Sequence, residues 1–424
     1  MMQQTRYPRL GERCWFERLE NGLPIYVVPR PHFEKQYAFF ATSYGGMDLR
    51  YQFDGRWLES PAGVAHFLEH KMFDTREGNA LQILSANGAS PNAFTSAEIT
   101  GYYFECTQGF EANLRTLLSF VSVPYFTAES VAKEQGIIGQ EIQMMEDNPD
   151  WKLYNNLLRG LYAHHPLRES VAGSQESISH ITAETLYNCH RAFYHPGNMV
   201  LCVAGDVDPE RVAAVARMVL PGDTRGKTKK DHGIPETMTA AQPVTEVQMA
   251  VSAPNFLLGY KAEPHPMGEE NLRLQLVGEL AAELLCGASS PLYERLYDEG
   301  LIDKSFGAVY EDYPDGAHLV LGGESRDPEQ VAQAIQAEGE RLAREGVPQD
   351  RFSRCQKAAY GSRVRALNAF DHCCIQLAQG AFKGYHYYRF PELYDGITPQ
   401  DVRAFFDRVV RQERAALSVV RPLE

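Results

Sequence analysis

The amino-acid sequence predicts an α+β fold of two duplicated domains, each an antiparallel sheet packed with helices. Two observations predict this fold. The order of strand-like and helix-like segments is repeated in the two halves of the chain, and a polar segment with little apolar surface separates the halves. The 424 residues are also too many for one ordinary hydrophobic core. We therefore expect a first domain at residues 1–220, a linker at 221–240 and a second domain at 241–424.

The first half of the chain opens and closes on strands. Runs rich in β-branched and aromatic residues favour strands, and longer segments without internal Gly or Pro favour helices. The expected elements are strands at 25–28 and 38–43, a helix at 60–74, a hairpin at 91–96 and 99–107, helices between 110 and 194, and a strand at 199–204.

The second half follows the same order. The expected elements are a strand at 247–253, a helix at 269–287, a hairpin at 308–310 and 319–321 with its turn at 314–316, two long helices, and a final strand at 416–420. The two halves share no residue-level identity, so the predicted duplication rests on the order of the elements.

The composition excludes several classes of protein. The formal net charge of −14 argues against binding to nucleic acid or to an anionic membrane, since both need clustered cations. No apolar run approaches the roughly 20 residues of a membrane span, and the N-terminus has no apolar stretch typical of a signal peptide. The eight cysteines are scattered without a Cys-x-x-Cys pair, which fits a reducing cytoplasm.

The segment from His66 to His70 predicts a metal site. It lies in a predicted helix, where residues four apart share one face, so the two imidazoles can bind the same ion. Glu69 lies beside them. A zinc ion lowers the pKa of the water that it binds to about 7, and a neighbouring carboxylate can then accept the proton, as amide hydrolysis requires. A purely structural zinc site normally has four protein ligands, often thiolates, and no cysteine lies nearby.

A third ligand is expected on a second helix, at 127–147. Glu134 and Glu141 lie seven residues apart and therefore on one face of it. Burying both glutamates is unfavourable unless they meet a cation. A solvated acidic stripe is the alternative that the spacing leaves open. Gly136 and Gly139 weaken this helix and predict close packing against another element.

The inverted order His-x-x-Glu-His, followed by the distal pair of glutamates, resembles the pitrilysin family of zinc peptidases, which includes insulin-degrading enzyme and mitochondrial processing peptidase. Similar stretches extend over residues 36–215. The resemblance implies one zinc ion per chain, held by His66, His70 and Glu141. It also implies that Glu69 is the general base and that Glu134 is a further catalytic-site carboxylate behind the ligands.

Residues 90–103 resemble the edge strand that lies beside the zinc ion in this family. A strand with free N–H and C=O groups can add an extended peptide by β-augmentation, which gives affinity with loose specificity. We therefore expect Asn92, Ala93, Phe94 and Thr95 to bind substrate. For Asn92, an ordinary turn residue before a strand is an equally good interpretation.

The second domain departs from the family pattern and is expected not to bind metal. Active single-chain relatives carry an arginine and a tyrosine there, which contact the substrate; Tyr297 and Asp303 stand at those positions. Arg295 and Tyr293 are near but out of register, and a solvated face and a packing aromatic are their simpler interpretations. The family closes four such domains around its substrate, so this chain resembles half of a clamshell. A homologous partner subunit is implied, and we favour a heterodimer over a homodimer.

The function expected from the sequence is therefore that of a zinc-dependent endopeptidase, which hydrolyses unfolded peptides in a closed chamber. One alternative is a maturation protease that trims leader peptides. Another is a non-catalytic structural subunit of a heterodimer, although all five residues of the metal motif are present. The same ligands would also accept manganese or cobalt.

Overall fold

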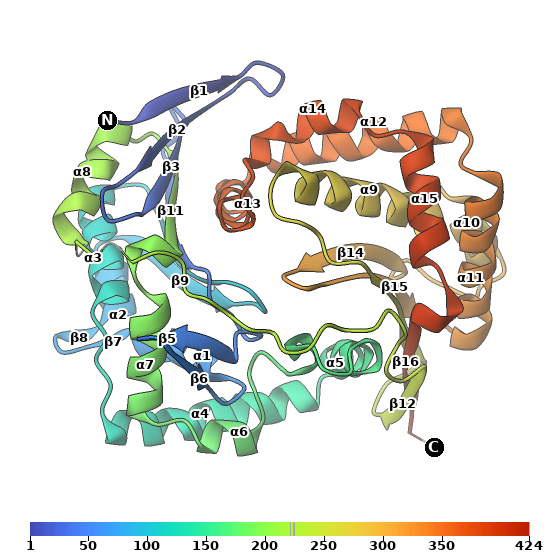
Figure 1. Cartoon of the computed structure of the whole chain (residues 1–424), viewed down its shortest axis with the longest axis horizontal. Coiled ribbons are helices and arrows are strands. Elements are labelled where there is room, and N and C mark those ends of the chain that lie inside the picture. The colour runs from blue at the N-terminus through green and yellow to red at the C-terminus, as the bar shows by residue number, and fades with distance from the viewer. Residues whose placement is uncertain (221, 224, 424) are drawn as a thin grey trace. The chain divides into compact units, whose positions relative to one another are not determined.

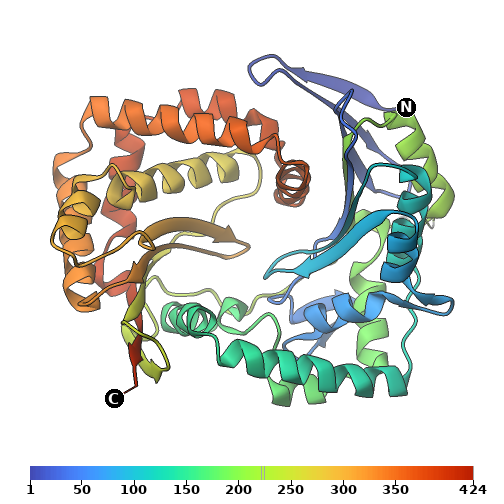
Figure 2. The same cartoon turned by 180° about the vertical axis from the view of Figure 1, so that it is seen from behind.

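The computed structural model describes residues 1–220, 222–223 and 225–423, which form two compact units (Figures 1 and 2). Unit 1 comprises Met1–Ile142, Ser170–His232 and Val364–Tyr388. Unit 2 comprises Gln143–Glu169, Gly233–Arg363 and Arg389–Glu424. Each unit thus contains a segment from the opposite half of the chain. The predicted division at residues 220 and 241 follows the chain order and stays a prediction.

A seven-stranded sheet forms the centre of unit 1, in the order β1-β2-β3-β11-β4-β10-β9. Neighbouring strands are antiparallel, except that β3 and β11 are parallel. Strand β11 is buried along its whole length, as its run of apolar residues requires. The strands of the sheet are β1 Gln3–Tyr7, β2 Glu12–Arg18, β3 Pro24–Pro29, β4 Gln36–Thr42, β9 Ala89–Thr95, β10 Thr100–Cys106 and β11 Met199–Gly205. Two small ribbons pair β5 Arg50–Phe53 with β6 Arg56–Glu59, and β7 Asp74–Thr75 with β8 Gly78–Asn79.

Helices cover both faces of this sheet. Helices α3 and α8 pack together on one face, and α13 packs against β4 and β11 on the other (Figure 1). Helix α4 begins in unit 1 and its last residues belong to unit 2. The helices are α1 Val64–Met72, α2 Ala80–Ala86, α3 Phe110–Ser122, α4 Ala128–Glu146, α6 Gln175–Ser179, α7 Ala183–Phe193, α8 Pro209–Val219 and α13 Phe370–Lys383, with 3₁₀ turns η2 Pro196–Asn198 and η3 Tyr387–Arg389.

Unit 2 is built around a five-stranded sheet in the order β12-β16-β13-β15-β14. Helix α5 packs on one face, where a Cβ at Gly259 of β13 would lie 2.9 Å from Leu161. The next residue, Tyr260, faces the other side and hydrogen bonds to Gln336 of α11 at 2.9 Å. The strands are β12 Val244–Met249, β13 Asn255–Ala262, β14 Gly307–Tyr313, β15 Gly316–Glu324 and β16 Ala415–Pro422. The helices are α5 Pro149–Leu161, α9 Glu269–Cys286, α10 Pro291–Asp298, α11 Pro328–Glu345, α12 Gln349–Ala366, α14 Phe390–Asp395 and α15 Pro399–Val409, with 3₁₀ turns η1 Pro166–Arg168 and η4 Gln412–Arg414.

The two sheets have the same strand topology. Numbered along the chain, β3, β4, β9, β10 and β11 of unit 1 lie in the spatial order 1-5-2-4-3, and so do β12 to β16 of unit 2. The predicted duplicated α+β fold is therefore confirmed. The sheets are not wholly antiparallel, because the first and last strands of each repeat lie side by side and run in parallel.

The prediction of the second half was wrong at its opening strands. It placed one strand at 247–253, where the structure has the edge strand β12 at Val244–Met249, and it missed the central strand β13 at Asn255–Ala262. Strand β13 contains Gly259 and Lys261, two residues that are unfavourable in a buried strand. Lys261 is tolerated there because its ammonium donates to Glu236 at 2.7 Å and to two backbone carbonyls.

The polar segment expected to be a linker is bonded to unit 1 over residues 225–232. Lys230 Nζ lies 2.8 Å from Asp48 Oδ2, and His232 Nε2 lies 3.1 Å from Asp48 Oδ1. The backbone of Gln52 donates to the carbonyl of Lys229 at 2.8 Å. Asp48 is buried, and although burial opposes its charge, Lys230 and His232 lower the pKa of this carboxyl. Residues 221 and 224 lie outside the described part of the chain.

We predict that Asp48→Asn lowers the free energy of unfolding by about 3–5 kcal/mol, because Lys230 keeps its charge without a buried partner. Urea unfolding measures the change. The control Asp350→Asn removes an exposed partner of Arg354 and should cost less than about 1 kcal/mol. The folded pKa of Asp48 lies below its unfolded value. The contribution of Asp48 to the free energy of unfolding is therefore complete above a pH of about 4, and it is lost as the pH falls through the folded pKa. An equal effect of both substitutions would contradict the prediction.

Candidate metal centre

Helix α1 carries the His66–His70 segment, and two glycines fix where this helix begins. Gly63 precedes the helix with φ 95°, a left-handed conformation that favours glycine. A Cβ at Gly63 would lie 2.6 Å from the carbonyl oxygen of Ala172, and one at Gly173 would lie 2.4 Å from that of Ala62. The two backbones therefore cross in close contact and hold the start of α1.

Helix α4 supplies the two glutamates, as predicted. Of its 19 residues, Val131, Ile138 and Ile142 are buried. The expectation that Gly136 and Gly139 pack closely is wrong for the described chain, because no heavy atom lies within 4 Å of a Cβ built at either glycine. Apolar packing therefore holds α4 by one narrow stripe, next to which the glutamates lie.

The structure brings together the three predicted ligands. The side chains of His66, His70 and Glu141 each offer one ligand atom, and these atoms lie within 4.8 Å of one another. Both histidines turn Nε2 toward Glu141, each at 3.7 Å from one of its oxygens. Burial, with a smaller effect of His70, lowers the pKa of His66 to about 4, so this imidazole is neutral at pH 7. It is the only such cluster of three or more His, Cys, Asp or Glu within the described residues.

Glu134 lies behind His70 and fixes the orientation of its ring. His70 Nδ1 is 3.1 Å from Glu134 Oε1. Because an ionised carboxylate only accepts hydrogen bonds, Nδ1 carries the proton and Nε2 presents its lone pair to the ligand cluster. Lys71 is buried beside the same carboxylate, with Nζ 3.9 Å from Glu134 and 2.5 Å from Asp74. Burial opposes the charge of His70, but the hydrogen bond with Glu134 and the nearby carboxylates outweigh it and raise the pKa of His70.

Glu69 lies beside the ligands, and the described contacts place its carboxylate against Thr95. Glu69 is 8% exposed, and its Oε2 accepts a hydrogen bond from Thr95 Oγ1 at 2.6 Å. Burial raises the pKa of Glu69, and the charge of Glu141 adds to this effect, while Thr95 and His70 act in the opposite direction. A raised pKa makes a carboxylate a stronger base, which suits a proton acceptor.

The predicted substrate strand is an edge strand, since β9 pairs with β10 alone within the described sheet. Two observations show which of its residues face the free edge. The N–H of Ser96 donates to the Ile99 carbonyl at 2.8 Å, and the N–H of Ala93 donates to its neighbour Asn92 Oδ1 at 2.9 Å. Hydrogen-bonded pairs alternate along an antiparallel ladder. The N–H and C=O groups of Ala93 and Thr95 therefore point away from β10.

The side chains of the same four residues divide between the two faces of the sheet. Thr95 contacts Glu69 of α1 on one face. Phe94 lies on the other face, where its ring stacks on Phe39 at 5.8 Å between centroids. Phe39 reaches it across Gly101 of β10, where a Cβ would lie 2.1 Å from the Phe39 ring. Asn92 is exposed on this second face and bonds to its own strand, so its side chain does not lie beside the metal ligands.

The residues expected at the positions of the family's arginine and tyrosine, Tyr297 and Asp303, belong to unit 2. Tyr297 is 43% exposed on α10 and stacks on Tyr293 at 5.9 Å. Asp303 accepts hydrogen bonds from the backbone and the hydroxyl of Ser305, at 2.8 and 2.5 Å. Arg295 is exposed on the same helix as Tyr297. None of these contacts resembles a catalytic pair.

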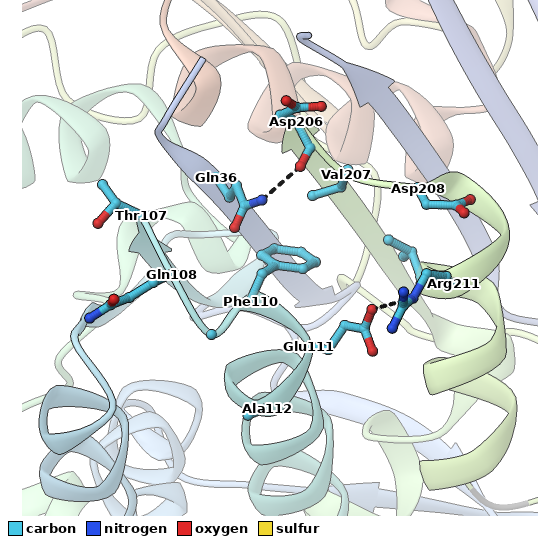
Figure 3. Close-up of a pocket in the computed structure, with 12 residues that line it drawn as sticks. Gln36, Thr107, Gln108, Phe110, Glu111, Ala112, Asp206, Val207, Asp208 and Arg211 are labelled. Atoms are coloured by element: carbon cyan, nitrogen blue, oxygen red, sulfur yellow. Dashed lines mark hydrogen bonds and ion pairs between the residues drawn. The ribbon is translucent and has the colours of Figure 1, made fainter. Parts of the chain in front are cut away.

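A separate pocket of about 480 Å³ lies at the other end of the unit 1 sheet, where α3 and α8 begin (Figure 3). Its lining includes Gln36, which donates to the Asp206 carbonyl at 2.7 Å, and the ion pair of Glu111 and Arg211. Strand β10 runs from Thr100 beside the candidate site to Cys106, next to Thr107 of this pocket, a span of about 20 Å. The pocket contains none of the predicted site residues.

The ligand cluster fits a zinc ion. Ligands bound to tetrahedral zinc at about 2.0–2.2 Å lie roughly 3.4 Å apart, close to the 3.7 Å between Glu141 and each histidine. Two imidazoles and one carboxylate form a three-ligand set, which leaves the fourth position open and is typical of catalytic zinc. No helix of the described residues has the length and apolarity to cross a bilayer.

Comparison with known proteins agrees with this fold. Residues 57–175 match the family described as Insulinase (Peptidase family M16), and residues 180–359 match the Peptidase M16 inactive domain. The chain is 37% identical, over its whole length and that of the relative, to an uncharacterized zinc protease of Bacillus subtilis, YmfH. A crystal structure described as an M16-like peptidase from Alicyclobacillus acidocaldarius is 32% identical with a TM-score of 0.93, covering 97% of this chain and 99% of that one. A Helicobacter pylori protease shares the fold at a TM-score of 0.80 and 18% identity, covering 96% and 99%.

The fold and the ligand cluster define a metallopeptidase-like protein of two duplicated α+β units. The chain belongs to peptidase family M16. This confirms the expected pitrilysin-type membership, and the match of the second half to an inactive domain agrees with the location of the ligand cluster in unit 1 alone among the described residues.

Sequence reasoning missed two supports of the site. Lys71 directly follows His70, and a lysine inside an amphipathic helix gives no sign that it is buried. Thr95 was expected to contact substrate, but its side chain is bonded to Glu69. Side chains alternate between the two faces of a strand, so Thr95 falls on the opposite face from Phe94. Together with the proximity of β9 to α1, this alternation could have indicated the contact.

We predict that Glu134→Gln weakens zinc affinity by about 10- to 100-fold while leaving the three ligands in place, because His70 loses its charged acceptor. Competition with a fluorescent zinc chelator measures the affinity. Glu129→Gln changes an exposed glutamate of the same helix and should have no effect. Glu141→Gln, which removes a ligand, should weaken binding further than Glu134→Gln; the reverse order would contradict the assignment of the two glutamates.

Proposed function

We propose that this protein is a zinc-dependent endopeptidase that hydrolyses unfolded peptides in a closed chamber formed with a partner subunit. The observation that carries the proposal is the gathering of the ligand atoms of His66, His70 and Glu141 within 4.8 Å, with Glu69 on the same helix. The zinc protease names of its relatives support the same chemistry. The single ligand cluster among the described residues favours one zinc ion per chain.

The residues of the cluster divide the work of hydrolysis. His66, His70 and Glu141 would hold the ion, which supplies a Lewis acid that polarises the scissile carbonyl and acidifies water. Glu69 accepts a proton from the attacking water and donates it to the leaving amine. Glu134 keeps the His70 ring in the tautomer that binds metal.

Strand β9 binds the substrate through its main chain. An extended peptide pairs with the outward N–H and C=O groups of Ala93 and Thr95, which places it next to Glu69. Main-chain pairing requires an unfolded segment and tolerates many side chains, which favours an unfolded peptide as substrate. Asn92 and Phe94 contact this peptide from the second face of the sheet.

A homologous partner subunit supplies the arginine and the tyrosine, because Tyr297 and Asp303 stand at those two positions in this chain. Asp303 stands where the family has a tyrosine, and its carboxylate accepts hydrogen bonds from Ser305 rather than donating one. A carboxylate cannot stabilise an oxyanion, which needs donors or positive charge. We favour a heterodimer because a second copy of this chain would lack the same donors.

The first test of the proposal replaces the base. Glu69→Gln should retain one zinc ion per chain and lower kcat by about 10²–10⁴-fold, since glutamine cannot accept the proton. Zinc content by mass spectrometry and cleavage of a quenched fluorescent peptide measure the two effects. Glu77→Gln changes an exposed residue near the end of α1 and should leave both unchanged. Loss of zinc from Glu69→Gln would contradict the role of base, and cleavage that persists after removal of zinc would contradict the metal mechanism.

The second test concerns the partner. Mixing the chain with a related chain that has arginine and tyrosine at the positions of Tyr297 and Asp303 should raise kcat/KM by at least about 10²-fold, the effect of one oxyanion donor. The partner with that tyrosine changed to phenylalanine is the control. Equal activity of the chain alone would overturn the requirement for a partner.

A further inference from the structure

Thr95 makes a hydrogen bond that a residue serving only to bind substrate would not need. Its Oγ1 lies 2.6 Å from Oε2 of Glu69. A hydroxyl has one hydrogen and an ionised carboxylate has none to give, so Thr95 donates and Glu69 accepts. The hydroxyl of Thr100, which donates to the carbonyl of Tyr44 at 2.9 Å, lies 3.4 Å behind Thr95 Oγ1. The Thr95 side chain is therefore held between the sheet and the carboxylate.

The backbone of the same residue faces the free edge of the sheet. The closing bond from Ser96 to Ile99 makes Thr95 and Thr100 a non-hydrogen-bonded pair, so the N–H and C=O of Thr95 point away from β10. One residue thus presents its main chain to an added strand and its side chain to Glu69. Within the described structure, no other residue of β9 hydrogen bonds to α1.

We propose that Thr95 is a positioning residue, which fixes the Glu69 carboxylate relative to the peptide-binding edge. This inference rests on the proposed function and deepens it. A glutamate side chain has three rotatable bonds, and Glu69 is the last residue before His70 on a helix whose other buried residues are mostly apolar. The hydrogen bond from Thr95 selects one orientation. It thereby sets the distance between the base and a peptide paired with β9.

The rate of catalysis is sensitive to small shifts in the position of a reacting group. A misplacement of about 1 Å can lower turnover by about 10²-fold, even when binding is unchanged. Loss of the Thr95 hydroxyl should therefore reduce kcat and spare KM, because the main-chain groups that bind the peptide remain. If Thr95 served only to pack the strand, its replacement by valine would leave kcat unchanged. Valine has the same shape and at least equal preference for strands.

The experiment compares Thr95→Val, which removes the donor, with Thr95→Ser, which retains it. Thr42→Val is the matched control: it removes a buried hydroxyl from the same sheet, one that donates to the carbonyl of Phe193 at 2.7 Å and does not touch Glu69. Zinc content, kcat and KM are measured for the zinc-loaded full chain together with its partner subunit. Crystal structures of the zinc-loaded chain then locate the Glu69 carboxylate in the wild type and in Thr95→Val.

We expect Thr95→Val to keep its zinc, to lose about 10²-fold in kcat with KM within a factor of two or so, and to show a displaced Glu69 carboxylate. Thr95→Ser should recover most of kcat, and Thr42→Val should match the wild type. Wild-type kcat in Thr95→Val, or an unmoved carboxylate, would overturn the inference. Absence of zinc-dependent cleavage by the wild type with its partner would instead overturn the proposed function, and the crystallographic comparison would still decide the role of Thr95.

Discussion

The hydrogen bond between His70 Nδ1 and Glu134 is the interaction on which the rest of the site depends. It joins two helices that lie 64 residues apart in the sequence, and it decides which nitrogen of His70 faces Glu141. Helix α4 has three buried apolar residues, so apolar packing alone specifies its rotation weakly. Charge specifies the rotation of α4 instead. Glu134 lies between His70 and buried Lys71, and Glu141 follows two turns further along the same face. A buried carboxylate is tolerated only with such partners, so the helix has one favourable position.

The edge of the sheet gives the second constraint. Strand β9 has one unpaired edge because it is the last strand in the sheet of unit 1. Its side chains alternate between the two faces of the sheet, so the two faces make different contacts. Thr95 meets Glu69 on the face of α1, while Phe94 is anchored to Phe39 across Gly101. This anchoring resists a slip in register, which would turn every side chain of β9 to the wrong face. A rigid edge is a suitable template for an added strand.

The sequence predicted the parts of the site that depend on short-range geometry. The shared face of His66 and His70 follows from helical periodicity, and the spacing of Glu134 and Glu141 follows in the same way. What could not be predicted depends on contacts between distant segments. The bond from Thr95 to Glu69 requires knowledge of which face of β9 meets α1. The ion pairs of the predicted linker could not be foreseen, because Lys230 and His232 look solvated in the sequence until Asp48, far away in the chain, is placed between them. The strand β13 was hidden by a buried lysine whose partner lies in the preceding loop.

The duplicated fold shows that this architecture does not by itself require a metal. Helix α9 stands between the second and third strands of its repeat, as α1 does in unit 1, and it packs on the edge strand β14 as α1 packs on β9. Yet its buried face is made of residues such as Leu272, Leu276 and Leu280, and Gly278 lies under the ring of Tyr310. Apolar packing therefore holds the helix against the edge strand in unit 2, at the place where unit 1 has charged groups and the ligand cluster beside β9. Because the same strand order is stable with either solution, the ligand cluster of unit 1 is not needed to specify the fold. Three side chains that could hold a metal ion, with Glu69 beside them on one partly exposed surface, are then best explained by the chemistry they can perform.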